Sequence, residues 1–92
     1  MLQFEPAKDP DEVLDYAIDW TDQLAIDADE IQGVTWTFPS GLTKASQDEA
    51  EGIARVFISG GAAGQRYEIG HRMVTAGGRT YDRTVTLAVR QA

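Results

Sequence analysis

The sequence predicts an all-β protein, an immunoglobulin-like antiparallel β-sandwich of about seven strands in Greek-key order. Apolar and polar residues alternate in several short segments, as they do in strands that bury one face. Turn-forming residues separate these segments at the spacing of about 8–12 residues that is typical of such sandwiches. The length of 92 residues fits a single domain spanning residues 1–92.

Five segments alternate most clearly: residues 13–20, 31–38, 53–59, 66–75 and 79–91. Two shorter strands are expected near Phe4–Lys8 and Leu42–Ser46. Greek-key pairing places the N-terminal strand in one sheet with residues 13–20 and 53–59, and the other three long segments in the second sheet. The best helical candidate, Asp9–Tyr16, begins like a helix but is expected to make a single turn before the strand.

Local features also match the immunoglobulin pattern. Trp36 occupies the place of the core tryptophan of the third strand, and Ile18 and Ile69 take the places of the two cysteines. The segment before Ile69 resembles a tyrosine corner formed by Tyr67. The predicted core is Leu14, Tyr16, Ile18, Trp20, Trp36, Phe38, Val56, Ile58, Tyr67, Ile69, Val85, Leu87 and Val89.

Alternation also constrains the hairpin that joins the last two strands. Their odd-numbered residues face inward, so the numbers of paired residues must have an even sum, for example Ile69 opposite Leu87 and His71 opposite Val85. A two-residue turn at Gly77-Gly78 would give an odd sum. We therefore expect a three-residue loop or a glycine bulge there.

Composition excludes several classes of protein. The chain has no cysteine, which rules out disulfides, zinc–thiolate sites and thiol nucleophiles. Its start lacks the basic and apolar regions of a signal peptide, and no apolar stretch approaches the ~18 residues of a membrane span. We expect a protein that folds in a reducing cytoplasm, without a membrane partner.

The net charge of −7 is unevenly distributed. Residues 1–46 hold ten acidic residues and two lysines, a net −8, whereas residues 47–92 hold five acidic residues and six arginines, a net +1. An acidic chain repels phosphate backbones, so no nucleic-acid partner is expected. The asymmetry suits contacts between copies of the chain, although charged surfaces are more often simply solvated.

The sequence contains no recognisable catalytic constellation. Its one histidine, His71, falls on the inward face of a strand and is expected to be a hydrogen-bonded core residue. The serines have no second base that could complete a triad. The acidic stretch Asp22–Glu30 offers oxygen atoms of the kind that bind calcium, but it lacks EF-hand spacing. We expect no enzyme, no cofactor and no metal site.

Four segments together resemble small proteins encoded in the head-gene region of tailed bacteriophages. They are Asp9–Trp20, Trp36–Leu42, Ser59–Gly64 and Ala76–Thr80. The resemblance covers nearly the whole chain and implies an immunoglobulin-like virion protein without catalytic residues. The favoured placement is a capsid decoration, or cement, protein on the outer capsid surface. Its partners would be the major capsid protein and other copies of itself.

Two alternatives remain open at this point. One is a neck, tail or fibre adaptor present in few copies, and the other is a carbohydrate- or surface-binding module. The N-terminal residues 1–10 form either an extended arm across an interface or an ordinary first strand that covers a sheet edge. The expected interface residues are Phe4, Glu5, Lys8, Asp9, Asp22, Asp27, Asp29, Glu30, Arg66, Arg72, Arg79 and Arg83.

Overall fold

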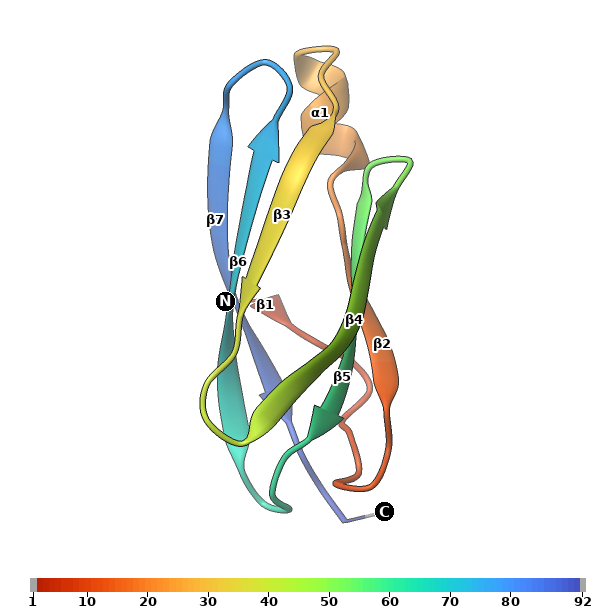
Figure 1. Ribbon diagram of the computed structural model, residues 1–92, viewed down its shortest axis with the longest axis vertical. Helices are drawn as coiled ribbons and strands as arrows, with labels where there is room; N and C mark the ends of the chain where they lie inside the picture. The colour runs from red at the N-terminus through yellow and green to blue at the C-terminus, as the bar shows by residue number, and fades with distance from the viewer. Residues whose placement is uncertain (1, 92) are drawn as a thin grey trace.

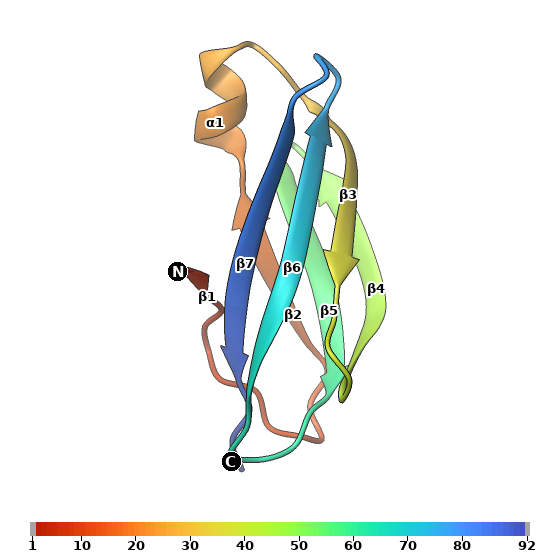
Figure 2. The same cartoon turned by 90° about the vertical axis from the view of Figure 1, so that its left-hand side faces the viewer.

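The computed structural model describes residues 2–91 and is an elongated β-sandwich of 42 × 21 × 19 Å (Figure 1). Its elements are β1 (Leu2–Gln3), β2 (Leu14–Asp19), α1 (Thr21–Ile26), β3 (Ile31–Thr37), β4 (Leu42–Ala50), β5 (Ile53–Gly60), β6 (Arg66–Thr75) and β7 (Thr80–Ala88). One sheet has the order β1-β7-β6-β3 and the other β2-β5-β4. The sheets pack face to face (Figure 2), which confirms the predicted seven-stranded immunoglobulin-like sandwich.

The grouping of strands agrees with the prediction except at the N-terminus. β2 pairs with β5, and β3, β6 and β7 share a sheet, as expected. The N-terminal strand was expected in the sheet that contains β2, but β1 joins the other sheet and runs parallel to β7, with Leu2 beside Val85. The predicted strand Phe4–Lys8 is also wrong. Pro6 has no N–H for a ladder, so this segment makes backbone contacts along that edge only at its two ends, where the Phe4 N–H donates to the Thr86 carbonyl of β7 and Lys8 bridges to Val89, just after β7.

The acidic stretch 22–30 was expected to be a loop, but it contains most of helix α1. The helix buries a single residue, Leu24, whose N–H donates to the Trp20 carbonyl at 2.9 Å. Six residues are too few for a helical period to stand out in the sequence. The segment that begins at Asp9 makes a turn and not a helix, closed by a hydrogen bond from the Glu12 N–H to the Asp9 carbonyl at 3.0 Å.

The predicted core is confirmed, since each of its residues is buried or packs against the buried cluster. Phe4, Leu24, Leu42, Ala54 and Met73 complete that cluster. Trp36 lies between the sheets, where its ring centroid is 4.2 Å from that of His71 and 6.0 Å from that of Phe4. The core is therefore continuous from the N-terminal segment to the four-stranded sheet.

The pairing of β6 with β7 keeps the even sum that the alternation required. Ile69 lies opposite Val85, two residues from the example given by the sequence, and His71 consequently lies opposite Arg83. The inward faces of both strands still coincide, because a shift of two residues preserves the side on which each side chain lies.

Two predicted local features at the ends of β6 are confirmed. Before the strand, the Tyr67 hydroxyl accepts a hydrogen bond from the Ala62 N–H at 2.9 Å, which makes the tyrosine corner. After the strand, residues 76–78 form the three-residue loop, and the Thr75 N–H donates to the Arg79 carbonyl at 2.8 Å. Gly78 ends that loop with φ of 91°, a conformation that favours glycine.

Candidate interaction surface

One lateral side of the sandwich, where β3 and β4 are the edge strands, is closed. Both strands are irregular, with register breaks after Ile31 in β3 and after Lys44 in β4. The Gln47 side chain spans this side and donates to the Val34 carbonyl at 3.2 Å. Bulges and charged edge residues discourage pairing with another strand. This side is therefore protected against strand addition.

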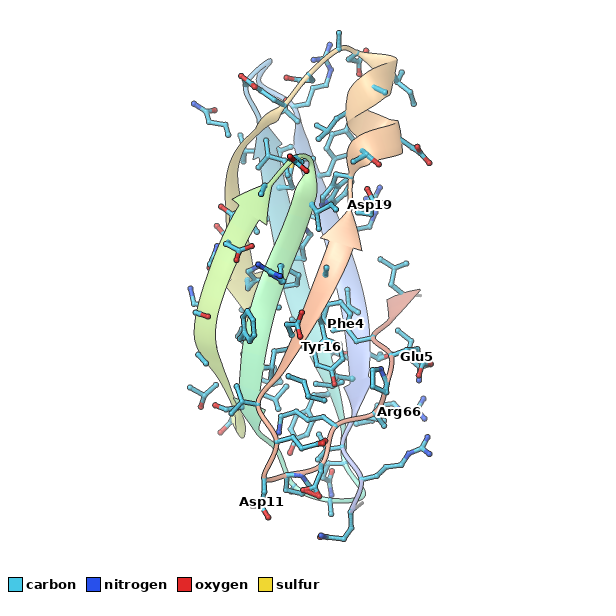
Figure 3. The ribbon with its side chains drawn as sticks, turned by 90° about the vertical axis from the view of Figure 1, so that its right-hand side faces the viewer. Phe4, Glu5, Asp11, Tyr16, Asp19 and Arg66 are labelled. Carbon is cyan, nitrogen blue, oxygen red and sulfur yellow. The ribbon has the colours of Figure 1, made fainter. Side chains whose placement is uncertain are left out.

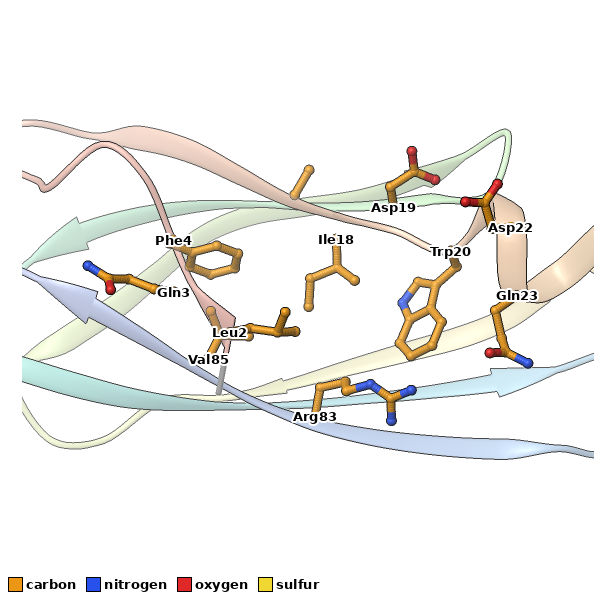
Figure 4. A pocket seen from close by; sticks show the side chains of 11 residues that line it. Leu2, Gln3, Phe4, Ile18, Asp19, Trp20, Asp22, Gln23, Arg83 and Val85 are labelled. Atoms are coloured by element: carbon orange, nitrogen blue, oxygen red, sulfur yellow. The ribbon is translucent and has the colours of Figure 1, made fainter.

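The opposite side, between β2 and the β1–β7 edge, is open. β1 pairs with β7 only at Val85 and Thr86, and among residues 2–91 no strand pairs with the outer edge of β2. A groove of about 420 Å³ lies between these edges (Figure 4). Its lining residues are Leu2, Gln3, Phe4, Ala17, Ile18, Asp19, Trp20, Asp22, Gln23, Arg83 and Val85.

The end of the groove next to α1 is formed by stacked aromatic and cationic side chains. The Trp20 indole N–H donates to His71 Nε2 at 2.9 Å. The Arg83 guanidinium lies 5.0 Å from the Trp20 ring centroid and 5.9 Å from that of Tyr81. A cation held over aromatic rings is attracted by their electron-rich faces. These contacts hold Arg83, a residue of β7, against Trp20, the residue that follows β2.

His71 is the hydrogen-bonded core residue that the sequence predicted, with 2% of its surface exposed. Because Nε2 accepts from Trp20, the neutral ring carries its proton on Nδ1. Burial, followed by the nearby charge of Arg83, lowers the pKa of His71 to about 4. The ring is therefore neutral at physiological pH and its basic nitrogen is already occupied.

This histidine makes stability depend on pH. Its pKa is lower in the folded chain than the usual 6.5, so between pH 6.5 and about 4 the unfolded chain binds the proton first. The stability that the neutral histidine contributes is present in full above pH 6.5 and is lost as the pH falls towards 4. A group that titrates only in the unfolded chain changes the free energy of unfolding by at most about 1.4 kcal/mol per pH unit. Solvent near the ring reduces this slope, so we expect urea unfolding to show that His71 lowers the free energy of unfolding by about 1–2 kcal/mol between pH 7 and 4.5.

The matched variant is His71→Gln, whose amide oxygen can still accept from Trp20 but does not titrate. The carboxylates of the acidic chain titrate alike in both proteins, so the difference between them isolates the histidine. An identical pH dependence in wild type and variant would contradict the assignment.

The β2 wall of the groove is acidic. Asp19 ends β2, and Asp22 of α1 lines the groove beyond it. Asp19 Oδ1 accepts hydrogen bonds from the Thr21 hydroxyl at 2.6 Å and the Thr21 N–H at 2.8 Å, and these bonds lower the pKa of Asp19. The carboxylate therefore stays ionised at neutral pH. A ligand in the groove would meet negative charge on one wall and Arg83 on the other.

Three of the four N-terminal residues expected at an interface are packed inside the chain, whereas Glu5 is exposed. Phe4 and Lys8 are buried, with 6% and 0% of their surfaces exposed, and Asp9 is also buried. Figure 3 shows Phe4 beside Tyr16 of β2, and the two rings stack at 4.9 Å. The segment therefore lies along the edge of β7 and packs on Tyr16 of β2, and it does not project as an arm.

Three other expected interface residues bind one another. Arg79 pairs with Asp27 at 3.3 Å and with Asp29 at 3.0 Å. Asp29 also accepts from the Gly77 N–H at 2.9 Å. A hydrogen bond from the Thr75 hydroxyl, helped by those from backbone N–H groups and Arg79, lowers the pKa of Asp29 to about 2. This cluster fastens the loop after α1 to the β6–β7 hairpin.

The remaining expected residues lie on the surface but do not converge. Exposed side chains are those of Glu5, Asp22, Glu30, Arg66, Arg72 and Arg83. Arg72 pairs with Asp82 at 2.7 Å on the outer face of the four-stranded sheet. The structure brings only Asp22 and Arg83 of this set into the groove. The sequence-based prediction missed Leu2 and Ala17, because it placed the N-terminal strand in the sheet that contains β2. Pro6 was the local sign that this strand ends early.

Residues 2–91 contain neither a metal-binding cluster nor a membrane-spanning helix. No group of three or more acidic or histidine side chains is arranged to hold a metal ion. No helix in this part of the chain is long and apolar enough to cross a membrane.

The fold and the open side define a small, acidic immunoglobulin-like module that presents unpaired strand edges on one lateral side. Comparison with protein-family models matches residues 8–88 to the podophage GP4 fiber-tail adaptor protein gp77 family. The match spans most of the chain, which therefore belongs to this family and is a structural protein of a phage virion. No curated protein matches the chain.

The family confirms the resemblance to virion proteins of tailed phages. It does not support the finer prediction of a decoration protein on the outer capsid surface with the major capsid protein as partner. Its description fits the alternative, a fibre adaptor.

Proposed function

We propose that this chain is a non-enzymatic adaptor that joins a tail fibre to the tail of a podophage. The observation that carries the proposal is the family match over residues 8–88, because the family is described as a fiber-tail adaptor. The partners are then tail and fibre proteins. The location is the tail, where the chain is present in few copies.

The shape of the molecule supports this role. An adaptor must contact two partners at once, which requires two separate surfaces held at a fixed distance. The sandwich is 42 Å long and about 20 Å across, with a core that runs between its sheets. Its open lateral side carries the groove, while the protected β3–β4 side and the two ends remain for a second contact.

The geometry around His71 supports a non-enzymatic role. Its Nε2 accepts from Trp20, and burial with a neighbouring Arg83 keeps the ring neutral. A general base needs a free nitrogen within reach of a substrate proton. The groove walls instead offer strand edges and fixed charges, which suit the binding of another protein.

Quantitative mass spectrometry of purified particles tests the adaptor role. We expect the chain at a copy number near that of the fibre protein and far below that of the major capsid protein. Particles from a phage lacking the gene should package DNA but lack fibres. A copy number in simple proportion to the shell protein, or fibres that remain on the mutant particles, would contradict the proposal.

A further inference from the structure

β2 is a regular strand edge without a bulge. Its six residues pair with β5 without a register break, unlike the pairing of β3 and β4 with their neighbours. The Trp20 N–H donates to the Gly52 carbonyl at 2.8 Å, so even-numbered residues of this ladder direct their backbone groups towards β5. Odd-numbered residues, namely Asp15, Ala17 and Asp19, direct theirs outward. This outer edge borders the groove.

The competing edge in the groove, that of β7, is already partly satisfied. The Phe4 N–H donates to the Thr86 carbonyl at 2.8 Å, which shows that even-numbered residues of β7 point their backbone groups outward. Among these, the Asp82 carbonyl accepts from Arg83 Nη1 at 2.8 Å. The guanidinium that caps this carbonyl is also stacked on Trp20. An incoming strand therefore meets fewer obstacles on β2.

Charge defines the chemistry of the incoming strand. Asp15 and Asp19 are exposed and lie four residues apart on the outer face of β2, with Asp22 beyond them. Residues directly opposite each other on neighbouring strands interact, and opposite charges there are favourable. The strand positions between them would point inward over Ile18 and Leu2, which is 45% exposed. The edge thus fits basic residues four positions apart, with an apolar residue between them.

We infer that β2 is the docking edge for an extended segment of a partner virion protein, which adds to the β2-β5-β4 sheet as a fourth strand. Two basic residues of that segment face Asp15 and Asp19, and an apolar side chain enters the groove. This inference rests on the proposed adaptor function, because it supplies one of the two contacts that an adaptor needs. Main-chain hydrogen bonds give such a contact its affinity, and the alternating side chains give it specificity.

The test uses a proline that blocks only the outer edge. The N–H of Ala17 points away from β5, so Ala17→Pro removes a docking donor without breaking a hydrogen bond inside the sheet. Ala17→Val is the matched control, since it adds bulk at the same exposed position and keeps the N–H. Each variant is supplied from a plasmid to a phage lacking the gene, and its amount in purified particles, with that of the fibre protein, is measured by mass spectrometry.

We expect Ala17→Val to match the wild type within about twofold, and Ala17→Pro to lower the amount of chain or of fibre in particles at least tenfold. The thermal unfolding of each purified variant is measured alongside. Equal incorporation of chain and fibre with both variants would overturn the inference. If the proline variant does not fold, the double charge reversal Asp15→Lys with Asp19→Lys replaces it, and Glu51→Lys with Glu68→Lys is its charge-matched control.

The charge reversal at β2 is expected to lower incorporation at least tenfold and the control reversal less than twofold. Equal effects of the two double variants would overturn the inference. The wild-type copy number judges the adaptor function separately. If the wild-type chain is as abundant as the shell protein but Ala17→Pro still lowers its incorporation, the adaptor role is contradicted and the docking edge is retained. If the wild-type chain is absent from particles, both proposals are overturned.

Discussion

Trp36→Ala is expected to lower the free energy of unfolding by about 3–5 kcal/mol, because a large aromatic side chain would leave a cavity in a packed core. The Trp36 side chain lies in the core between the sheets, with ring contacts to both Phe4 and His71. Only 7% of its surface is exposed. Urea unfolding followed by far-ultraviolet circular dichroism measures the loss, since that observable does not depend on the missing indole.

Phenylalanine substitutions at the two tryptophans provide the control. The Trp36 indole N–H has no hydrogen-bond partner within residues 2–91, whereas that of Trp20 donates to His71. Trp36→Phe therefore loses packing alone, and Trp20→Phe also leaves His71 Nε2 without its donor. We expect Trp20→Phe to cost about 1 kcal/mol more. A Trp36→Ala variant within 1 kcal/mol of the wild type would contradict the place of this residue in the core.

The strands and the core could be read from the sequence because burial of one sheet face imposes a local pattern. β5 is the clearest example: Ala54, Val56 and Ile58 are buried, and the residues between them face outward. The same alternation requires that paired residues of β6 and β7 have numbers with an even sum, and this requirement predicted the three-residue loop between them. These features depend only on neighbours in the chain.

Features that depend on distant partners were not predictable in the same way. Nothing local to Leu2 reveals that it pairs with Val85 and not with β2, since either choice buries Phe4. The groove exists because of that choice, so the candidate site was missed together with the pairing. Helix α1 was not predicted for a different reason: it buries one residue, Leu24, and a single buried residue gives no helical periodicity in the sequence.

Lys8 is the clearest departure from what residue type alone suggests, because lysine is rarely buried without a partner. Its surface is 0% exposed, and Nζ donates to the carbonyls of Gly60 at 2.6 Å and Asp9 at 2.8 Å. Its own backbone N–H donates to the Ala88 carbonyl at 3.0 Å. Burial lowers the pKa of Lys8, and the neighbouring acids, Glu12 foremost, oppose that shift. The side chain ties the N-terminal turn to the end of β5.

Lys8→Met is expected to destabilise the fold by about 2–4 kcal/mol. Methionine fills a similar volume and relieves the burial of a charge, which by itself would be neutral or favourable. The cost comes from the carbonyls of Gly60 and Asp9, which stay in place and lose the donor that lies 2.6 and 2.8 Å away. Urea unfolding at pH 7 measures the change. Lys44→Met is the control, because Lys44 is exposed on β4 and its ammonium group donates to the side chain of Gln47 at the surface, so its loss should stay within about 0.5 kcal/mol. Equal stability of the two methionine variants would mean that the buried ammonium group does not hold the N-terminal turn.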